Sequence, residues 1–253
     1  MPRSSHGGRH ELGQNFLTHR RTISRIAELV ADSPGPILEI GSGDGALTRE
    51  LARLDRPLVA IDVDEHRVRR LARALPGVEV RRADALHHPL DAPSIVGNIP
   101  FHLTTPILRR LLSTGTWEHA VLLTQWEVAR KRAGVGGGTM MTAQAAPWFT
   151  TSLVQRVPAQ HFVPRPSVDG GVLQIRRRPE PLLPASRRSP YDRFVRAVFT
   201  GRGGTLDRIL ARAAGAGPAQ ARRALQEAGV PRGGLPRDVG PEQWAALFRG
   251  LHG

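Results

Sequence analysis

The chain contains no cysteine among its 253 residues, and Lys131 is its only lysine. The absence of thiols excludes disulfide bonds, zinc sites with thiolate ligands and a cysteine nucleophile. Aromatic residues make up only 5% of the chain, and no apolar run approaches the ~18 consecutive residues that a membrane span needs. Residues 1–10 are polar and basic with no apolar stretch behind them, unlike a secretory signal. We therefore expect a cytoplasmic protein without a membrane segment.

Acidic residues are scarce relative to basic ones. The chain has 36 Lys plus Arg against 22 Asp plus Glu, a net charge of +14 and a pI near 11.7. A field of this strength attracts polyanions because binding releases their condensed counterions. A compositional bias toward arginine also raises the charge, but it does not explain why so few acids balance it. The composition therefore favours nucleic acid as the partner.

Short apolar segments alternate with amphipathic ones through the first half of the chain. The pattern predicts strands at residues 37–40, 58–61, 78–82, 94–97 and 120–124, and helices at residues 22–31, 44–54, 65–75 and 105–112. Strands separated by helices of ~10 residues indicate βαβ crossovers. We therefore expect an α/β fold with a mainly parallel sheet, covered by helices on both faces.

The pattern changes after residue 126. A glycine cluster at 134–138 is typical of a loop, and two further strands at 153–157 and 172–176 are expected to form a hairpin at the sheet edge. Beyond a proline-rich stretch, the apolar spacing favours short helices in a tail where arginines outnumber acids. We place a domain boundary there, so that residues 1–180 form one domain and residues 181–253 a small, basic, helical second domain.

A glycine-rich loop follows the first strand of the predicted sheet. Gly41 and Gly43 allow a sharp turn and a close approach of the backbone to a ligand, at the edge where α/β proteins bind ligands. The loop also fits a relaxed dinucleotide fingerprint ending at Ala46, with Asp62 about twenty residues further on. By itself, this loop does not separate a nicotinamide cofactor from S-adenosylmethionine.

Three later strands each end in a polar residue, namely Asp62, Asp84 and Asn98. The carboxyl ends of parallel strands share one edge, so these side chains are expected to meet there. Asp62 can accept hydrogen bonds from both ribose hydroxyls, and Asp84 from an adenine amino group. Each acid alone is equally typical of a helix N-cap. All three together favour an adenosine-containing cofactor.

The most informative segment is Asn98-Ile99-Pro100-Phe101. The exocyclic amine of adenine is a poor nucleophile because its lone pair is delocalised into the ring. The Asn98 amide oxygen and the Ile99 carbonyl can each accept one amine hydrogen, which reorients the lone pair toward a sulfonium methyl. Pro100 would fix the turn and Phe101 would stack on the base. Such a transfer depends on positioning, and it requires no metal.

At these motifs the chain resembles the ribosomal RNA adenine dimethyltransferases. Residues 13–17 resemble the N-terminal cofactor motif of that family, residues 39–45 its glycine loop and residues 98–101 its catalytic loop. Residues 161–170 are similar to its late segment, whose phenylalanine faces the target base. The resemblance covers nearly the whole chain.

The resemblance implies a Rossmann-like class I methyltransferase domain over residues 1–180 and a helical, RNA-binding domain over residues 181–253. The implied cofactor is S-adenosylmethionine, the implied partner is ribosomal RNA, and we expect a monomer without a metal. The residues implied to contact the cofactor are Asn15, Leu17, Gly41, Gly43, Asp62, Asp84, Ala85 and Asn98. Those implied to act on the adenine are Asn98, Ile99, Pro100, Phe101 and Phe162.

Two positions depart from the family pattern. The catalytic loop of the family more often ends in tyrosine, and Phe101 keeps the stacking face while it lacks the hydroxyl. The second cofactor acid is commonly glutamate, whereas Asp62 is one methylene shorter.

The family has two branches. One dimethylates two adjacent adenines of 16S rRNA, and the other dimethylates one adenine of 23S rRNA and confers resistance to macrolide-type antibiotics. Residues 123–130, 168–171 and 194–203 resemble the resistance branch of actinobacteria, which we favour.

Two other classes of protein remain as alternatives. A nicotinamide-dependent oxidoreductase needs a positioned proton donor, and none of the 10 histidines lies in a recognisable catalytic setting. A non-catalytic RNA-binding protein on the same fold would have no need for Asn98 and Pro100. Both alternatives are therefore disfavoured.

Overall fold

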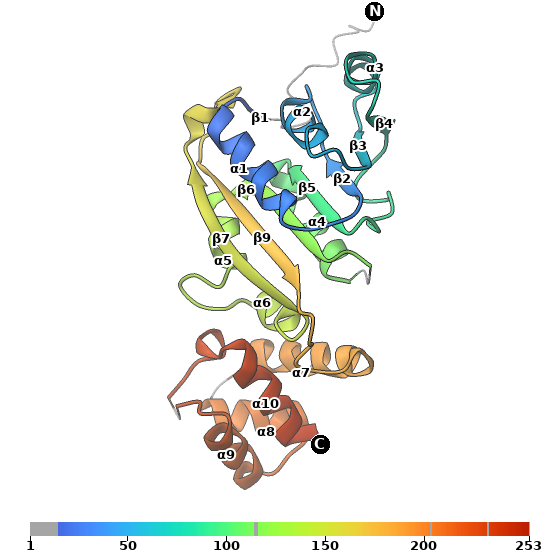
Figure 1. Cartoon of the computed structure of the whole chain (residues 1–253). Helices are drawn as coiled ribbons and strands as arrows, with labels where there is room; N and C mark the ends of the chain where they lie inside the picture. Colours follow the sequence, from blue (N-terminus) through green and yellow to red (C-terminus); the bar gives the residue numbers. More distant parts are fainter. Residues whose placement is uncertain (1–14, 114–115, 203, 232, 253) are drawn as a thin grey trace, which may run out of the picture. The chain divides into compact units, whose positions relative to one another are not determined.

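A seven-stranded sheet in the order β4-β3-β2-β5-β6-β9-β7 organises the chain (Figure 1). The structure is a computed structural model and describes residues 15–113, 116–202, 204–231 and 233–252. The strands β4, β3, β2, β5 and β6 pair in parallel, as predicted. The strands of this sheet are β2 (Ile37–Ile40), β3 (Leu58–Asp62), β4 (Glu79–Arg82), β5 (Ser94–Asn98), β6 (His119–Gln125), β7 (Phe149–Val157) and β9 (Gly170–Arg177).

The helices before and between the parallel strands lie where the apolar spacing predicts them. They are α1 (Arg20–Ala31), α2 (Ala46–Ala52), α3 (Glu65–Ala74) and α4 (Thr104–Ser113), and the 3-10 helix η1 (Phe101–Leu103) leads into α4. The predicted start of α2 at residue 44 is wrong. Gly45 has a φ of 79°, in the left-handed region, so the right-handed helix begins only after it.

The region after β6 contains more helix than the sequence predicts. Two short helices, α5 (Trp126–Arg132) and α6 (Met140–Ala145), flank the predicted glycine loop. The predicted pair of strands is confirmed as β7 and β9, which are neighbours in the sheet and run in opposite directions (Figure 1). The strand β7 forms the edge, and it begins at Phe149 rather than at residue 153.

A two-stranded sheet joins the start of the described chain to the late segment. The strand β1 (Phe16–Leu17) pairs antiparallel with β8 (Phe162–Val163), so that Leu17 lies opposite Phe162. The short helix η2 (Ala159–His161) precedes β8, and the Thr18 N–H donates to the His161 carbonyl at 2.8 Å. Two segments about 145 residues apart in the chain are therefore held side by side.

The described residues divide into two compact units. The sheet unit comprises those of Met1–Ala129 and Leu153–Gln174, and the helical unit comprises those of Arg130–Ser152 and Ile175–Gly253. Each unit is thus made of two separate segments of the chain. The prediction that residues 1–180 bind the cofactor and residues 181–253 bind RNA stays a prediction.

The helical tail that the sequence predicts is confirmed. It contains η3 (Ala185–Arg187), α7 (Arg188–Thr200), α8 (Leu206–Ala214), α9 (Pro218–Glu227), η4 (Pro236–Asp238) and α10 (Pro241–His252). The α7 and α10 helices are joined by buried rings: Tyr191 and Phe194 of α7 contact Phe248 of α10 at centroid distances of 5.3 and 5.7 Å. The Tyr191 hydroxyl donates to the Ala143 carbonyl, which ties α6 to the same cluster. Among the helices that the structure describes, none is long and apolar enough to cross a membrane.

Candidate active site

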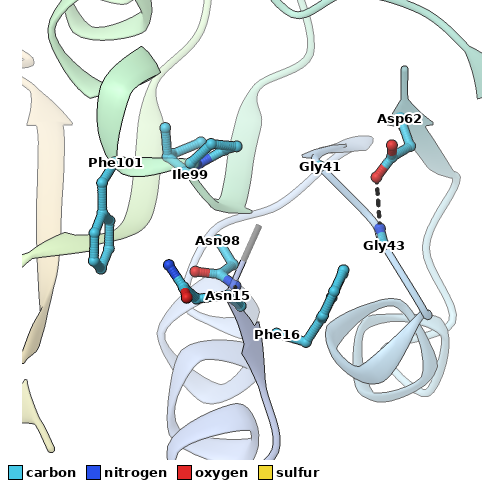
Figure 2. Close-up of a pocket in the computed structure, with 9 residues that line it drawn as sticks. Asn15, Phe16, Gly41, Gly43, Asp62, Asn98, Ile99 and Phe101 are labelled. Atoms are coloured by element: carbon cyan, nitrogen blue, oxygen red, sulfur yellow. Dashed lines mark hydrogen bonds between the residues drawn. The ribbon is translucent and has the colours of Figure 1, made fainter. Parts of the chain in front are cut away.

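The candidate site lies where the order of the strands reverses. The strand β2 pairs with β3 on one side and with β5 on the other, both in parallel. Connections leave such a point in opposite directions, and the crevice between them is where open α/β sheets bind ligands. A hollow at this point is lined by Asn15, Phe16, Gly41, Gly43, Asp62, Asn98, Ile99, Pro100 and Phe101 (Figure 2). All of these except Phe16 are predicted site residues.

The glycine loop turns because three of its glycines adopt left-handed backbone. Gly41 has a φ of 72° and Gly43 a φ of 53°. The Gly41 N–H donates to the Ile61 carbonyl at 2.8 Å, which fastens the loop to the end of β3. A Cβ on Gly43 would lie 2.8 Å from Cε1 of Phe16, closer than such atoms approach. A larger residue is therefore excluded here by both backbone conformation and space.

Asp62 is fixed by the backbone around it. One carboxylate oxygen accepts the Gly43 N–H at 2.8 Å and the other accepts the Asp64 N–H at 2.9 Å. The side chain is buried, yet it borders the hollow. Because a carboxylate oxygen can accept more than one hydrogen bond, Asp62 retains acceptor capacity toward the hollow.

The amide of Asn98 is oriented by a carbonyl group. Its Nδ2 donates to the backbone oxygen of Asn15 at 2.7 Å. A carbonyl oxygen accepts hydrogen bonds and cannot donate them, so the NH2 end of the Asn98 amide must face Asn15. The Oδ1 atom is thereby left as the acceptor of the side chain, as the predicted role requires.

The backbone of the catalytic loop is held at both ends. The Ile99 N–H donates to the Leu123 carbonyl of β6 at 2.9 Å, and the Leu103 N–H donates to the Pro100 carbonyl at 2.9 Å. Pro100 has the φ of −52° that its ring imposes. Figure 2 shows the rings of Phe101 and Phe16 on either side of Asn98.

Two predicted site residues lie in the hydrophobic core instead of the lining of the hollow. Leu17 is 5% exposed and Phe162 is 2% exposed, and both belong to the cluster beneath the sheet. The Phe162 ring packs against Gly170, where an added Cβ would lie 2.9 Å from its Cζ. The roles given to these two residues stay predictions.

Asp84 and Ala85 also lie outside the lining of the hollow. The Ala83 N–H donates to the Asp62 carbonyl at 2.9 Å, which places Asp84 beside the end of β3. The Leu86 N–H donates to the Asp84 carboxylate at 2.8 Å and holds the pKa of that group below its usual range; burial opposes this shift and His87 reinforces it. Asp84 is therefore a fixed acceptor at neutral pH, and its role also stays a prediction.

Phe16 is a residue of the hollow that the sequence analysis missed. Its ring lies against the glycine loop, and the guanidinium carbon of Arg67 sits 4.3 Å from the ring centroid. Phe16 lies inside residues 13–17, which resemble the cofactor motif of the family. The resemblance could therefore have predicted Phe16 as a site residue, but only Asn15 and Leu17 were predicted. Gly13 and Gln14 of that segment lie outside the described residues.

A buried acid precedes the glycine loop. Glu39 of β2 is 1% exposed, and its Oε2 has no hydrogen-bond partner among the described residues. Burial raises the pKa of this carboxyl to about 7; the Asp62 charge adds to this shift, and the polar hydroxyl of Thr48 opposes it. At neutral pH the group is therefore divided between its charged and neutral forms.

The residues of the hollow fit S-adenosylmethionine. Left-handed glycines allow close backbone approach, Asp62 supplies a carboxylate for hydroxyls, and the acceptor atom of Asn98 stands beside them. The hollow is partly open, and its volume is about 30 Å³.

A family model described as ribosomal RNA adenine dimethylase matches residues 5–250 of the chain. The chain belongs to this family. It is 47% identical to the mycinamicin-resistance protein MyrB of Micromonospora griseorubida, over 96% of this chain and 79% of that protein. It is 51% identical to an rRNA adenine N-6-methyltransferase of Corynebacterium diphtheriae, over 81% of this chain and 83% of that protein.

Solved structures agree with this assignment. The crystal structure of the 23S rRNA methyltransferase ErmE superposes with a TM-score of 0.85 at 38% identity, over 94% of this chain and 100% of that one. A dimethyladenosine transferase from Plasmodium falciparum has a TM-score of 0.76 at 19% identity, over 92% and 96% of the two chains, and shows the fold alone. The predicted family and methyltransferase fold are confirmed.

Proposed function

We propose that this protein transfers methyl groups from S-adenosylmethionine to the N6 amine of an adenine in 23S ribosomal RNA and thereby confers resistance to macrolide-type antibiotics. The observation that carries the proposal is the convergence of the glycine loop, Asp62 and the segment Asn98–Phe101 on one hollow. The two motifs follow β2 and β5, which pair directly in the sheet.

The glycine loop and the two acids hold the cofactor in this proposal. The backbone at Gly41 and Gly43 lies against it, Asp62 accepts from ribose hydroxyls and Asp84 accepts from the adenine amine. When bound, S-adenosylmethionine supplies an electrophilic methyl group on a positively charged sulfur. Asn15, Leu17 and Ala85 complete the cofactor side, Leu17 through its main chain.

The catalytic loop prepares the target amine. Asn98 Oδ1 and the Ile99 carbonyl each accept one amine hydrogen, which turns the nitrogen lone pair out of conjugation and toward the methyl group. Pro100 fixes the turn, Phe101 stacks on the base, and Phe162 supports it from the core side. Positioning rather than acid or base chemistry accounts for the rate, since the leaving group is already activated.

The closeness of the relatives supports 23S over 16S rRNA as the substrate. The small-subunit methyltransferase A of Chlorobium limicola is 35% identical over 78% of this chain, against 47% over 96% for the mycinamicin-resistance protein. We propose that exposed arginines of the helical unit, such as Arg193, Arg208 and Arg222, bind RNA phosphates. A monomeric state and a cytoplasmic location stay predictions.

A methyl-transfer assay tests the proposal. Purified protein is incubated with S-adenosylmethionine labelled with tritium in the methyl group and with protein-free 23S or 16S rRNA. We expect label in 23S rRNA, recovered as N6-methylated adenosine after digestion to nucleosides, and none with the Asn98→Ala variant. Label in 16S rRNA alone would favour the small-subunit activity, and binding of NAD without methyl transfer would favour an oxidoreductase.

A further inference from the structure

The sheet unit has a second hollow, whose lining residues differ from those of the candidate site. It has a volume of about 600 Å³, within the range of sites that hold small ligands. It is lined by Gln125, Trp126, Glu127, Arg156, Ala159, Arg165, Pro166, Ser167, Val168 and Asp169. Two of the segments that resemble the resistance branch, 123–130 and 168–171, contribute to this lining, and the proposed function leaves that part of them without a role. We call this hollow the Trp126 groove.

Arg156 lies over the ring of Trp126 in the Trp126 groove, and we call this pair of side chains the platform. The guanidinium carbon of Arg156 lies 5.4 Å from the centroid of the Trp126 ring, and both side chains are at least partly exposed. A Cβ on Gly171 would lie 3.2 Å from Cε3 of Trp126, so the ring rests on the bare backbone of β9. The absence of a side chain at Gly171 thus allows Trp126 to lie where it does.

Asp169 holds this platform together. One carboxylate oxygen accepts from Arg156 Nε at 2.7 Å and the other accepts the Ala159 N–H at 2.8 Å. The Asp169 carbonyl accepts the Trp126 N–H at 2.8 Å. The Ala159 hydrogen bond, together with Arg156, holds the pKa of Asp169 below its usual range, so the carboxylate stays charged at neutral pH. Arg156 is therefore oriented before any ligand arrives.

The chemistry of the platform suits one nucleotide. An indole ring and a guanidinium plane are the surfaces on which unstacked bases lie in RNA complexes. Arg165 is exposed at the groove and its charge acts on Asp169, so it adds a cation for a phosphate. Glu127 also lines the groove, and its negative charge disfavours a second phosphate there.

The groove is joined to the candidate site through β6 and η2. The Ile99 N–H binds the Leu123 carbonyl, and Trp126 follows three residues later, directly after the end of β6. On the other side, Ala159 begins η2, which runs straight into Phe162. We therefore expect an RNA whose adenine enters the first hollow to bring a neighbouring nucleotide to the second.

We infer that the Trp126 groove binds an unpaired nucleotide next to the target adenine, with its base stacked on Trp126 and Arg156 and a phosphate at Arg165. The inference rests on the proposed function, because it assigns a second subsite for the same RNA. It makes the groove a determinant of which adenine is chosen, since the occupant is the neighbour of the target in sequence.

A double-mutant cycle between protein and RNA tests this inference. The probes are a 23S rRNA fragment that carries the target adenine and two copies of it, each abasic at one flanking nucleotide. With wild-type protein, one of the abasic fragments should lower kcat/KM on the order of tenfold, mainly through KM. Trp126→Ala should lower kcat/KM on the intact fragment by a similar factor and should show little further loss on that abasic fragment.

Variants of matched chemistry separate stacking from other roles. Trp126→Phe keeps a ring and should retain most activity on the intact fragment. Arg165→Ala should raise KM and reduce its salt dependence, whereas Arg53→Ala, an exposed arginine of the same unit, should do neither. Should Trp126→Ala fail to fold, Arg156→Ala takes its place in the cycle, since that side chain is 60% exposed.

The outcomes distinguish the two proposals. If wild-type protein methylates no adenine in the intact fragment, the proposed function itself fails. If methylation occurs but the losses from Trp126→Ala and from each abasic nucleotide multiply in full, the groove does not hold a neighbouring base and this inference is overturned. Unchanged affinity for S-adenosylmethionine in Trp126→Ala is expected throughout.

Discussion

The two units bury their few aromatic residues to different extents. In the sheet unit, Phe16, Phe101 and Trp126 are only partly buried and border hollows. In the helical unit the rings pack on one another, and the buried ones are Trp148, Phe149, Tyr191, Phe194, Trp244 and Phe248. Trp117 and Phe162 are also buried in the sheet unit, so the difference lies in the three rings that this unit leaves partly exposed at its hollows. We interpret these three rings as binding surfaces and the buried rings of the helical unit as a source of its stability.

This contrast predicts that one substitution has different consequences in the two units. Phe248 is 1% exposed and contacts both Tyr191 and Phe194. Phe248→Ala should destabilise the protein by about 3 to 5 kcal/mol, because it leaves a cavity in the aromatic cluster. Urea unfolding measures the loss, and calorimetry should show unchanged S-adenosylmethionine affinity below the transition. A loss of unfolding free energy below about 1 kcal/mol would show that the aromatic cluster does not stabilise the helical unit.

At Asn98 we expect the reverse, namely a large loss of activity with little loss of stability, because this side chain acts on the reacting atoms. Asn98→Ala should lower kcat on the order of 10² to 10³-fold, the usual cost of removing one preorganised hydrogen-bonding group. Rates are compared at saturating cofactor, because Asn98 also borders the cofactor side of the hollow. Thermal unfolding should change little. An Asn98→Ala enzyme with near wild-type turnover would show that lone-pair alignment by this residue is not the mechanism.

Glu39 is a residue next to the glycine loop whose titration should change the stability of the sheet unit. Its pKa is about 7 in the folded protein against 4.5 ordinarily. Between those pH values the unfolded chain releases a proton that the folded chain keeps, so the carboxyl costs stability progressively as pH rises through this window. Glu39→Gln cannot titrate and should gain up to about 3 kcal/mol over wild type between pH 4.5 and 7. Urea unfolding at both ends of the window would contradict this if the difference between the proteins stayed constant.

The same substitution at Phe101 of the sheet unit can be compared with Phe248→Ala of the helical unit. Phe101→Ala should forfeit roughly 1 to 3 kcal/mol in kcat/KM for RNA, the amount expected for stacking on a base, without a comparable loss of stability. Phe101→Tyr keeps the ring, restores the residue more usual in the family and should retain activity. If the tyrosine variant were as impaired as the alanine variant, stacking would not explain the position.

The smallest effect is expected at Asp84. Asp84→Ala removes an acceptor that Leu86 and His87 hold in place, and it should weaken S-adenosylmethionine binding by about 0.5 to 1.5 kcal/mol. Titration calorimetry measures this change. Unchanged affinity would remove Asp84 from the cofactor site and leave it as a cap for the turn that follows β4.

The sequence predicts the parallel sheet and most of the hollow because both depend on local patterns. The strand β2 lies at the predicted residues 37–40, where three of the four residues are apolar and a glycine loop follows. Gly41 follows β2, and Asp62 and Asn98 are the last residues of β3 and β5. Parallel pairing alone brings such positions to one edge of the sheet. Most residues of the hollow could therefore be predicted from short sequence segments.

What the sequence analysis missed depends on long-range contacts or on very short elements. The strands β1 and β8 have two residues each, too few to show a periodicity, and they form only because each finds the other. The helices α5 and α6 span less than two full turns. The burial of Phe162 and the hollow-lining position of Phe16 are likewise decided by partners distant in sequence.

The most direct test of the account is the position of the modified nucleotide in cells. Primer extension is performed on 23S and 16S rRNA from a host that carries this protein, its Asn98→Ala variant or neither. The account predicts a reverse-transcription stop at an adenine of 23S rRNA with the wild-type protein alone, together with macrolide resistance in the same cells. A stop at adjacent adenines of 16S rRNA, or no stop in either RNA, would contradict it.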